Sequence, residues 1–524
     1  MRITVQCLSV VLLLVGQSAA AQVAPAPDRQ EGDGPFERLI VRGAIMIDGT
    51  GSPPRGPVDI VIEGDRIVRI TSLGDPTLAI DPDRHPGEAA REIDAHGMYV
   101  MPGIIDLHAH TGGLPKTPEA EYVYKLWLAH GITTVRGVSF GGFEWSLSEK
   151  QRSAEHAITA PHMVSYHRPG SGWEEGPINT PEMARAWVRF AASRGVDGLK
   201  LGSYPPDIMA ALLDEARKHR MGSTAHLGQM GVAQMNALDA ARLGLSSMTH
   251  FYGLFEALYE HNDVQPWPVE MNYNDEQFRF GQVAQQWHLV TPGGRKWTAV
   301  MDEFLALNYY INPTLAIYSA GRDVMRARNA DWHATYTLPS LQAFFNPDRA
   351  DHGSYFFDWT THDEVAWKKF YQVWMRFLNE FKNRGGKVTV GSDSGYIYQL
   401  YGFGTILELE MLQEAGFHPL EVVRAATMHG AEEIFKPLGE PIDYGILRAG
   451  LRADLLVLEE NPLQNFKTLY GTGALRLNDN TGTMERVGGV RYTIKGGIVY
   501  DARALLQDVA DMVTLAREAE TASR

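Results

Sequence analysis

Cysteine is almost absent from this 524-residue chain, and its single copy, Cys7, lies in a segment typical of an export signal. The predicted mature chain therefore has no disulfide, no thiolate metal ligand and no cysteine nucleophile. Positive charge is also scarce: 48 Lys and Arg stand against 63 Asp and Glu, a formal net charge of -15. This balance argues against a nucleic-acid partner, whose binders need a basic face.

The N-terminal apolar run, residues 8–15, is too short to span a bilayer. It follows Arg2 and precedes three small residues, Ala19, Ala20 and Ala21, which is the pattern of a signal peptide cleaved before Gln22. We therefore expect a signal peptide over residues 1–21 and a secreted or periplasmic protein with no membrane attachment after cleavage. Residues 22–35 are expected to form a flexible lead-in.

After the lead-in, both ends of the chain show the pattern of β-strands. Apolar and polar residues alternate in residues 37–71, 92–100, 453–458 and 489–497, and glycines separate the runs. They predict one small β domain built from both ends of the chain, over residues 36–100 and 436–505. A C-terminal helix is expected over residues 506–524.

The centre, residues 101–435, has a different pattern, in which short apolar runs alternate with amphipathic stretches about every 25 residues. Such a βα repeat predicts α/β architecture with a parallel sheet, closed at this length into an eight-stranded barrel. Residues 251–385 interrupt the repeat and contain seven of the eleven tryptophans. Two interpretations stay open for this insertion, which are extra helices packed by aromatic residues and a wall or lid over the site.

Six polar residues follow the predicted barrel strands at the ends where barrels carry their chemistry. His108 and His110 are two apart on one strand and so point the same way. Lys200, His226 and His250 are separated by 26 and 24 residues, one βα unit each, and Asp393 ends the last strand. A lone histidine is usually hydrogen-bonded, a lone lysine solvated and a lone aspartate part of a turn. These ordinary roles do not explain why all six residues lie at strand ends with barrel spacing.

The six residues predict a site for two divalent metal ions, with zinc the first choice for histidine and carboxylate ligands. Lys200 cannot bind a metal as an ammonium group. Burial beside cations would lower its pKa and leave a neutral amine, which can add carbon dioxide to form a bridging carbamate, N6-carboxylysine. We expect His108, His110 and Asp393 to hold one ion and His226 and His250 the other.

The sequence resembles the amidohydrolase superfamily, and within it the branch of imidazolonepropionase and the Xaa-Pro dipeptidase (prolidase)-like enzymes. The resemblance rests on residues 45–51 (IMIDGTG), 102–110 (PGIIDLHAH), 130–136 (HGITTVR), 391–394 (GSDS) and 450–458 (GLRADLLVL). It implies a distorted (β/α)8 TIM barrel, a small β-sandwich made from both chain ends, and a two-metal hydrolase. Gly137 and Ala225 depart from the branch, where Asp and Tyr are usual, so the substrate is less well defined.

The hypothesis for function is hydrolysis of a C–N amide or peptide bond in a small substrate, a dipeptide or an N-acyl amino acid. A hydroxide shared by the ions attacks the carbonyl, and Asp393 transfers the proton to the leaving amine. Candidates for substrate contacts are His162, His167, Arg136 and Tyr252, with Tyr204 as another phenol. For Arg136 a structural role is an equal alternative, and for the two tyrosines aromatic packing is the favoured alternative.

Two alternatives stay open. One is a lactonase, esterase or phosphotriesterase using the same ligands, and the other is a barrel that binds without catalysis. The residues do not decide between a monomer and a homo-oligomer.

Overall fold

The computed structural model describes residues 23–523 except 76, 80, 112, 139–140, 263 and 351. The predicted signal peptide, residues 1–21, lies outside the described residues. Within the described part, no helix is both long and apolar enough to cross a membrane. The predicted lead-in packs against the body: Val23 and Ala26 are buried, and Ala24 and Asp33 form β-bridges with Glu119 and Val499. These contacts are those of an ordered segment, not a free one.

A curled parallel sheet of eight strands occupies the centre of the molecule. Its strands, in chain order and in spatial order, are β6 (Ile104–Ala109), β7 (Ile132–Val138), β8 (His162–His167), β9 (Gly198–Leu201), β10 (Gly222–Ala225), β11 (Ser247–Thr249), β12 (Tyr310–Asn312) and β13 (Lys387–Val388). Backbone hydrogen bonds from Leu107 N to Val390 O and from Asp393 N to His108 O, both 2.9 Å, join the two ends of the sheet. The predicted parallel sheet is confirmed, and its curling brings its first and last strands together.

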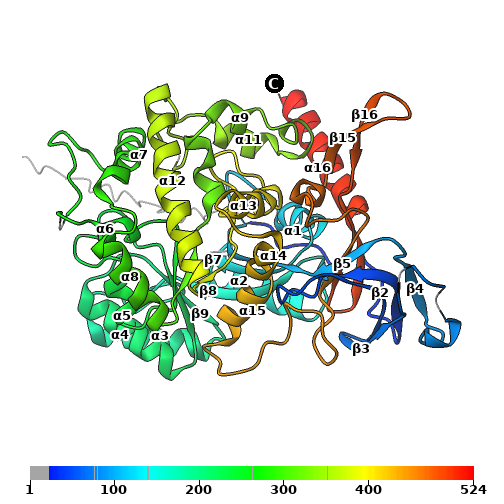
Figure 1. The fold of residues 1–524 in the computed structure, drawn as a ribbon. Coiled ribbons are helices and arrows are strands. Elements are labelled where there is room, and N and C mark those ends of the chain that lie inside the picture. Colours follow the sequence, from blue (N-terminus) through cyan, green and yellow to red (C-terminus); the bar gives the residue numbers. More distant parts are fainter. Residues whose placement is uncertain are drawn as a thin grey trace, which may run out of the picture.

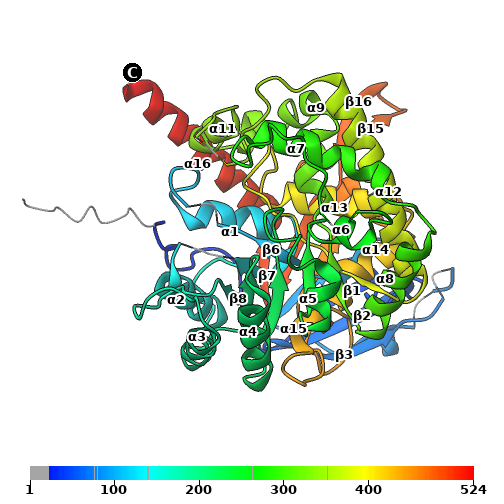
Figure 2. The same ribbon diagram turned by 90° about the vertical axis from the view of Figure 1, so that its left-hand side faces the viewer.

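Helices follow the strands and cover the outside of this sheet (Figure 2). They are α1 (Ala120–Ala129), α2 (Phe143–Ala154), α3 (Pro181–Ser193), α4 (Pro206–Lys218), α5 (Ala237–Arg242), α13 (Phe403–Glu414), α14 (Pro419–Ala426) and α15 (Met428–Phe435). Helix α3 shows why they form. The Thr180 side chain caps its start by accepting from Met183 N, Pro181 fits the first turn, and Trp187 and Val188 lie on its buried face.

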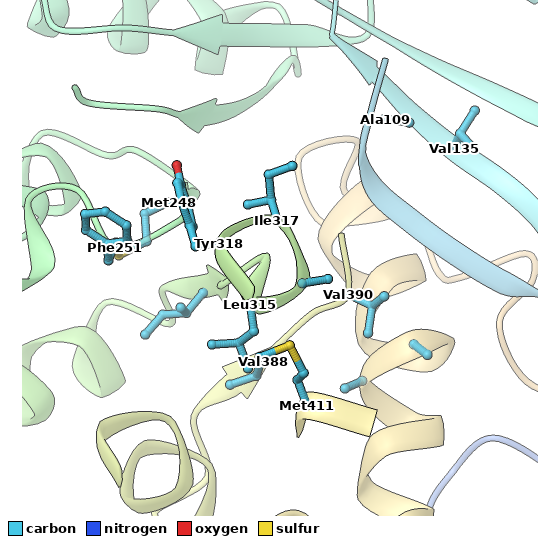
Figure 3. Packing of buried hydrophobic residues seen from close by; sticks show 14 of the residues in the cluster. Ala109, Val135, Met248, Phe251, Leu315, Ile317, Tyr318, Val388, Val390 and Met411 are labelled. Carbon is cyan, nitrogen blue, oxygen red and sulfur yellow. The ribbon is translucent and has the colours of Figure 1, made fainter. Parts of the chain in front are cut away.

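The insertion is mainly helical, as one of the two interpretations predicted. It contains α6 (Leu254–Leu258), α7 (Glu276–Gln285), α8 (Arg295–Ala306), α9 (Val324–Arg328), α10 (His333–Tyr336), α11 (Pro339–Phe345) and α12 (Thr361–Asn383), with the 3-10 helices η2 (Gln286–Leu289) and η3 (Leu315–Gly321). Aromatic packing holds it to the sheet: the Phe251 ring, just after β11, lies edge-on to the buried rings of Trp367, Phe370 and Trp374 in α12. Figure 3 shows Phe251 and Tyr318 in this core.

A second sheet combines strands from both ends of the chain, as predicted (Figure 1). Its strands run in the order β18 (Ile498–Asp501), β17 (Val490–Lys495), β14 (Leu455–Leu458), β5 (Tyr99–Pro102), β1 (Leu39–Met46), β2 (Arg55–Glu63) and β3 (Arg66–Ser72), with β4 (Arg91–Asp94) also paired to β1. This is one mixed sheet, and the predicted β-sandwich is not confirmed. A separate hairpin, β15 (Ala474–Asn478) and β16 (Thr483–Val487), precedes β17.

The C-terminal helix α16 (Ala502–Ser523) begins four residues earlier than predicted and packs on α1. It follows β18 without a connecting loop, since β18 ends at Asp501. The Asp501 side chain accepts the backbone N–H groups of Arg503 and Ala504, so this carboxylate caps the helix start.

Candidate metal centre

Three histidines surround the Asp393 carboxylate at the carboxyl ends of the parallel strands. His110 Nε2 lies 3.0 Å and His108 Nε2 3.4 Å from Asp393 Oδ1, and His250 Nε2 lies 3.6 Å from Asp393 Oδ2. His108 is in β6, His110 follows it, His250 follows β11 and Asp393 follows β13. The curvature of the sheet therefore gathers side chains from distant parts of the chain.

Lys200 and His226 complete the group. Lys200, in β9, has its Nζ 3.4 Å from His108 Nε2 and 3.3 Å from Thr249 Oγ1. The His226 ring, after β10, lies 4.7 Å from the His250 ring between centroids. All six residues that the sequence singled out thus meet in one cluster.

Two residues of the cluster have a backbone conformation that is uncommon outside glycine. His250 and Asp393 have φ of 65° and 52°, in the left-handed region that His and Asp enter more readily than most residues. The buried Asp106 carboxylate accepts the backbone N–H groups of His108 at 3.0 Å and Ser392 at 3.1 Å. Asp106 thereby ties the end of β6 to the loop that carries Asp393.

The donor set suits a divalent cation. Donor atoms of His108, His250 and Asp393 all lie within 4.8 Å of one another. His250 Nδ1 is hydrogen-bonded to Thr314 Oγ1, which directs Nε2 toward Asp393, and this Nε2 is buried without a hydrogen-bond partner among the described residues. Burial also lowers the pKa of His108 and His250 well below the ordinary histidine value, so both stay neutral, the form that binds metal.

Burial also disfavours the charged ammonium form of Lys200. Its side chain is 2% exposed, and burial, which is the largest effect, lowers its pKa well below the usual lysine value. Asp393 acts in the opposite direction but does not reverse the shift. A neutral amine at this point removes the charge that would otherwise repel a cation.

A cavity of about 420 Å³ opens above the cluster. Its wall is shared by the strand ends and the insertion, so the insertion both packs by aromatic residues and forms part of the pocket. The lining outside the six predicted residues comprises Arg168, Tyr252, Tyr273, Asn274, Glu276, Arg279, Phe280, Ile317, Tyr318, His352, Gly353, Tyr396 and Ile397.

Tyr252 is the one predicted substrate-contact residue that lines this cavity. Its ring lies 4.5 Å from the His226 ring between centroids, and its hydroxyl is 2.8 Å from that of Tyr318. Burial raises the pKa of the Tyr252 phenol, which therefore stays protonated and able to donate a hydrogen bond. Tyr204, the other phenol considered, does not line the cavity.

The structure places the two histidine candidates away from the cavity, so their predicted substrate contacts require correction. His162 begins β8, at the end of the strand opposite the metal cluster, and its Nε2 is 3.1 Å from Asp454 Oδ1. His167 ends β8, but its ring packs on Phe143 with centroids 4.8 Å apart, and it is not part of the cavity lining.

Of the two roles considered for Arg136, the structure shows the contacts of the structural one. It is fully buried in β7, its Nε donates to Leu107 O at 2.9 Å, its guanidinium forms an ion pair with Glu433, and it lies over the Tyr166 ring. It does not line the cavity.

Replacing Arg136 should therefore destabilise the fold. Arg136→Met leaves Glu433 as an unpaired buried carboxylate, and we expect the free energy of unfolding to fall by about 3–5 kcal/mol. Urea unfolding measures the change. The double variant Arg136→Met/Glu433→Leu removes both charges and should recover part of the loss. Unchanged stability together with a raised KM for an anionic substrate would restore Arg136 as a substrate ligand.

No family model matches the sequence. Several curated proteins match parts of it, among them an adenine deaminase and an N-acyl-D-aspartate deacylase. The adenine deaminase of Nitratidesulfovibrio vulgaris (strain DP4) is 39% identical over 87 residues, which are 16% of this chain and 15% of that protein. The N-acyl-D-aspartate deacylase of Alcaligenes xylosoxydans xylosoxydans is 39% identical over 97 residues, 18% of this chain and 16% of that protein. The chain thus spans less than a fifth of the length of either relative.

Among solved structures, a Xaa-Pro dipeptidase with methionine bound in its active site superposes with a TM-score of 0.58. The identity is 18%, and the match covers 88% of this chain and all of that one. The predicted resemblance to prolidase-like amidohydrolases is confirmed at the level of the fold.

Proposed function

We propose that this protein is a binuclear metal-dependent amidohydrolase that cleaves a C–N amide or peptide bond of a small substrate. One observation carries the proposal: four histidines, a buried lysine and an aspartate meet in a cluster at the base of a cavity of about 420 Å³. Cavities of this size accept small molecules. The proposal draws further support from the similarity to proteins named as a dipeptidase and a deacylase.

In this proposal His108, His110 and Asp393 would hold one divalent cation and His226 and His250 the other, with zinc as the metal and a carboxylated Lys200 as a further anionic ligand. When bound, two such cations make a water molecule more acidic and polarise a carbonyl group.

The protein's own groups supply the proton transfers. Asp393 is 14% exposed, so its carboxylate reaches the cavity and can accept a proton from the attacking water and deliver it to the leaving amine. The Tyr252 hydroxyl, positioned by Tyr318, can donate a hydrogen bond to the substrate carbonyl oxygen.

The decisive experiment compares zinc-loaded protein against dipeptides, N-acyl amino acids, lactones and a phosphotriester. We expect hydrolysis of the amides, with the highest kcat/KM for a dipeptide or N-acyl amino acid. Turnover of lactones or phosphotriesters alone would favour the alternative reaction. A protein that binds less than about one ion per chain and hydrolyses nothing would be a binding protein.

Removal of metal should affect activity and stability together. After chelation we expect loss of hydrolysis, and recovery on addition of Zn²⁺. Since an ion that binds only the folded state stabilises it, Zn²⁺ at 100 times its Kd should add about 2.7 kcal/mol to the free energy of unfolding. Thermal unfolding of apo and zinc-loaded protein measures this. An apo protein with full activity and an unchanged Tm would contradict a metal-dependent function.

We further propose export to the periplasm or the medium, on the basis of Arg2, the apolar residues 8–15 and the three alanines before Gln22. N-terminal sequencing of protein secreted by a bacterial host tests it. We expect the chain to begin at Gln22.

A further inference from the structure

Three basic side chains line the cavity in addition to the proposed metal ligands: Arg168, Arg279 and His352. Glu276, in α7, engages two of them. Arg279 lies 3.0 Å from Glu276 Oε1 and also donates to Tyr273 O, and His352 forms an ion pair with the same carboxylate. Arg279 and His352 are therefore both paired with Glu276 within the wall of the insertion.

Arg168 differs from both. It follows β8 directly and lies outside the insertion. Its side chain is exposed, and no hydrogen bond or ion pair joins its guanidinium to another of the described residues. The cavity thus presents one cation whose charge the described protein leaves unmatched.

The surroundings place this guanidinium close to the reaction centre. Arg168 lines the same cavity as His226, a proposed metal ligand, and Tyr396. His226 follows β10 and Tyr396 follows β13, so Arg168 faces the cavity from a third side. The acidic lining residues are Glu276, already paired, and Asp393, within the metal cluster.

We propose that Arg168 binds a free carboxylate of the substrate and thereby selects amides that carry one, such as dipeptides and N-acyl amino acids. A guanidinium presents two parallel N–H donors that match the two oxygens of a carboxylate. The aromatic rings of Tyr252, Phe280 and Tyr318 also line this cavity and offer an apolar surface to such a substrate. This inference rests on the proposed function and narrows its substrate class.

The test uses a substrate pair that differs only in this group: an N-acyl amino acid or dipeptide hydrolysed by the wild type, and the same compound with its carboxylate converted to a carboxamide. For the wild type, amidation should raise KM about 10- to 100-fold, the factor expected for loss of charge-assisted hydrogen bonds. Arg168→Gln should raise KM for the carboxylate by the same factor, with little change in kcat and little effect on the carboxamide.

Two further variants make the result specific. Arg168→Lys keeps the charge without the paired donors and should recover part of the affinity for the carboxylate. Arg69→Gln removes one positive charge at an exposed position in β3 of the other sheet and should leave both KM values unchanged. Zinc content and circular dichroism should equal the wild type in all three.

The possible outcomes distinguish a failure of the Arg168 inference from a failure of the proposed amidohydrolase function. If Arg168→Gln and Arg168→Lys hydrolyse both compounds as the wild type does, the Arg168 inference is wrong and the proposed function stands. If the zinc-loaded wild type hydrolyses no amide at all, the proposed function fails and the substrate assignment with it. If the wild type prefers the carboxamide, a free carboxylate is not the recognised group.

Discussion

Asp393→Asn should lower kcat by about 10²- to 10⁴-fold even with Zn²⁺ supplied in excess. An amide has nearly the shape of the carboxylate but cannot accept the proton from water or hold a negative charge against His108 and His110. The change is also mild for the backbone, because Asp393 has a φ of 52°, where Asn is as well tolerated as Asp. The loss should therefore be chemical and not a consequence of misfolding.

Metal analysis beside the kinetics separates the two roles of this residue. A variant that binds less zinc has lost a ligand, and one that binds the wild-type amount but turns over slowly has lost its proton acceptor. Asp479→Asn, at the exposed turn between β15 and β16, is the matched control and should have wild-type activity. Near-full activity of Asp393→Asn with metal bound would remove Asp393 from the catalytic step.

The metal cluster could be predicted because its members occupy strand ends in a repeating pattern. Lys200, His226 and His250 come from three successive strands, β9, β10 and β11, which pair in register as neighbours. Once the parallel sheet is recognised, the positions of these side chains follow from the strands alone. The helices and loops between them do not alter that geometry.

Substrate contacts could not be predicted in the same way. His162 and His167 are five residues apart and mark the two ends of β8, but apolar content alone does not show where such a short strand begins. Because His162 lies at the start of β8, it contacts Asp454, which is distant in sequence and directly precedes β14 of the second sheet. Arg168, which follows β8 directly and lines the cavity, also fits the strand-end rule, but nothing in the sequence distinguishes it from His167 beside it.

The insertion was still harder to place, because its position depends on contacts between segments far apart in the chain. The Phe280 ring in α7 stacks on that of Tyr355 with centroids 4.4 Å apart, and Glu276 accepts Gly353 N at 2.8 Å. No periodic pattern in the sequence indicates these pairings. Aromatic composition therefore predicted the packing, but it did not show which residues reach the cavity.

Lys200→Ala should abolish stable binding of the second metal ion, since it removes the one side chain proposed to bridge the pair. The wild-type amine is buried, 3.4 Å from His108 Nε2, and its pKa is lowered well below the ordinary lysine value, mainly by burial. A neutral amine of this kind is the form that adds carbon dioxide and yields an anionic two-oxygen ligand. We expect zinc content to fall from about two ions per chain to one or fewer, and activity to fall with it.

A short carboxylic acid such as acetate or propionate should enter the space left by the lysine side chain and restore part of both properties, because it offers the same two oxygens. Lys218→Ala, at an exposed site in α4, is the control and should neither lose zinc nor respond to the acid. Carbon-13 NMR of wild-type protein in labelled bicarbonate should show a carbamate signal that Lys200→Ala lacks. Full zinc content in Lys200→Ala would rule out the carbamate, and the histidines with Asp393 would then have to bind the metal without it.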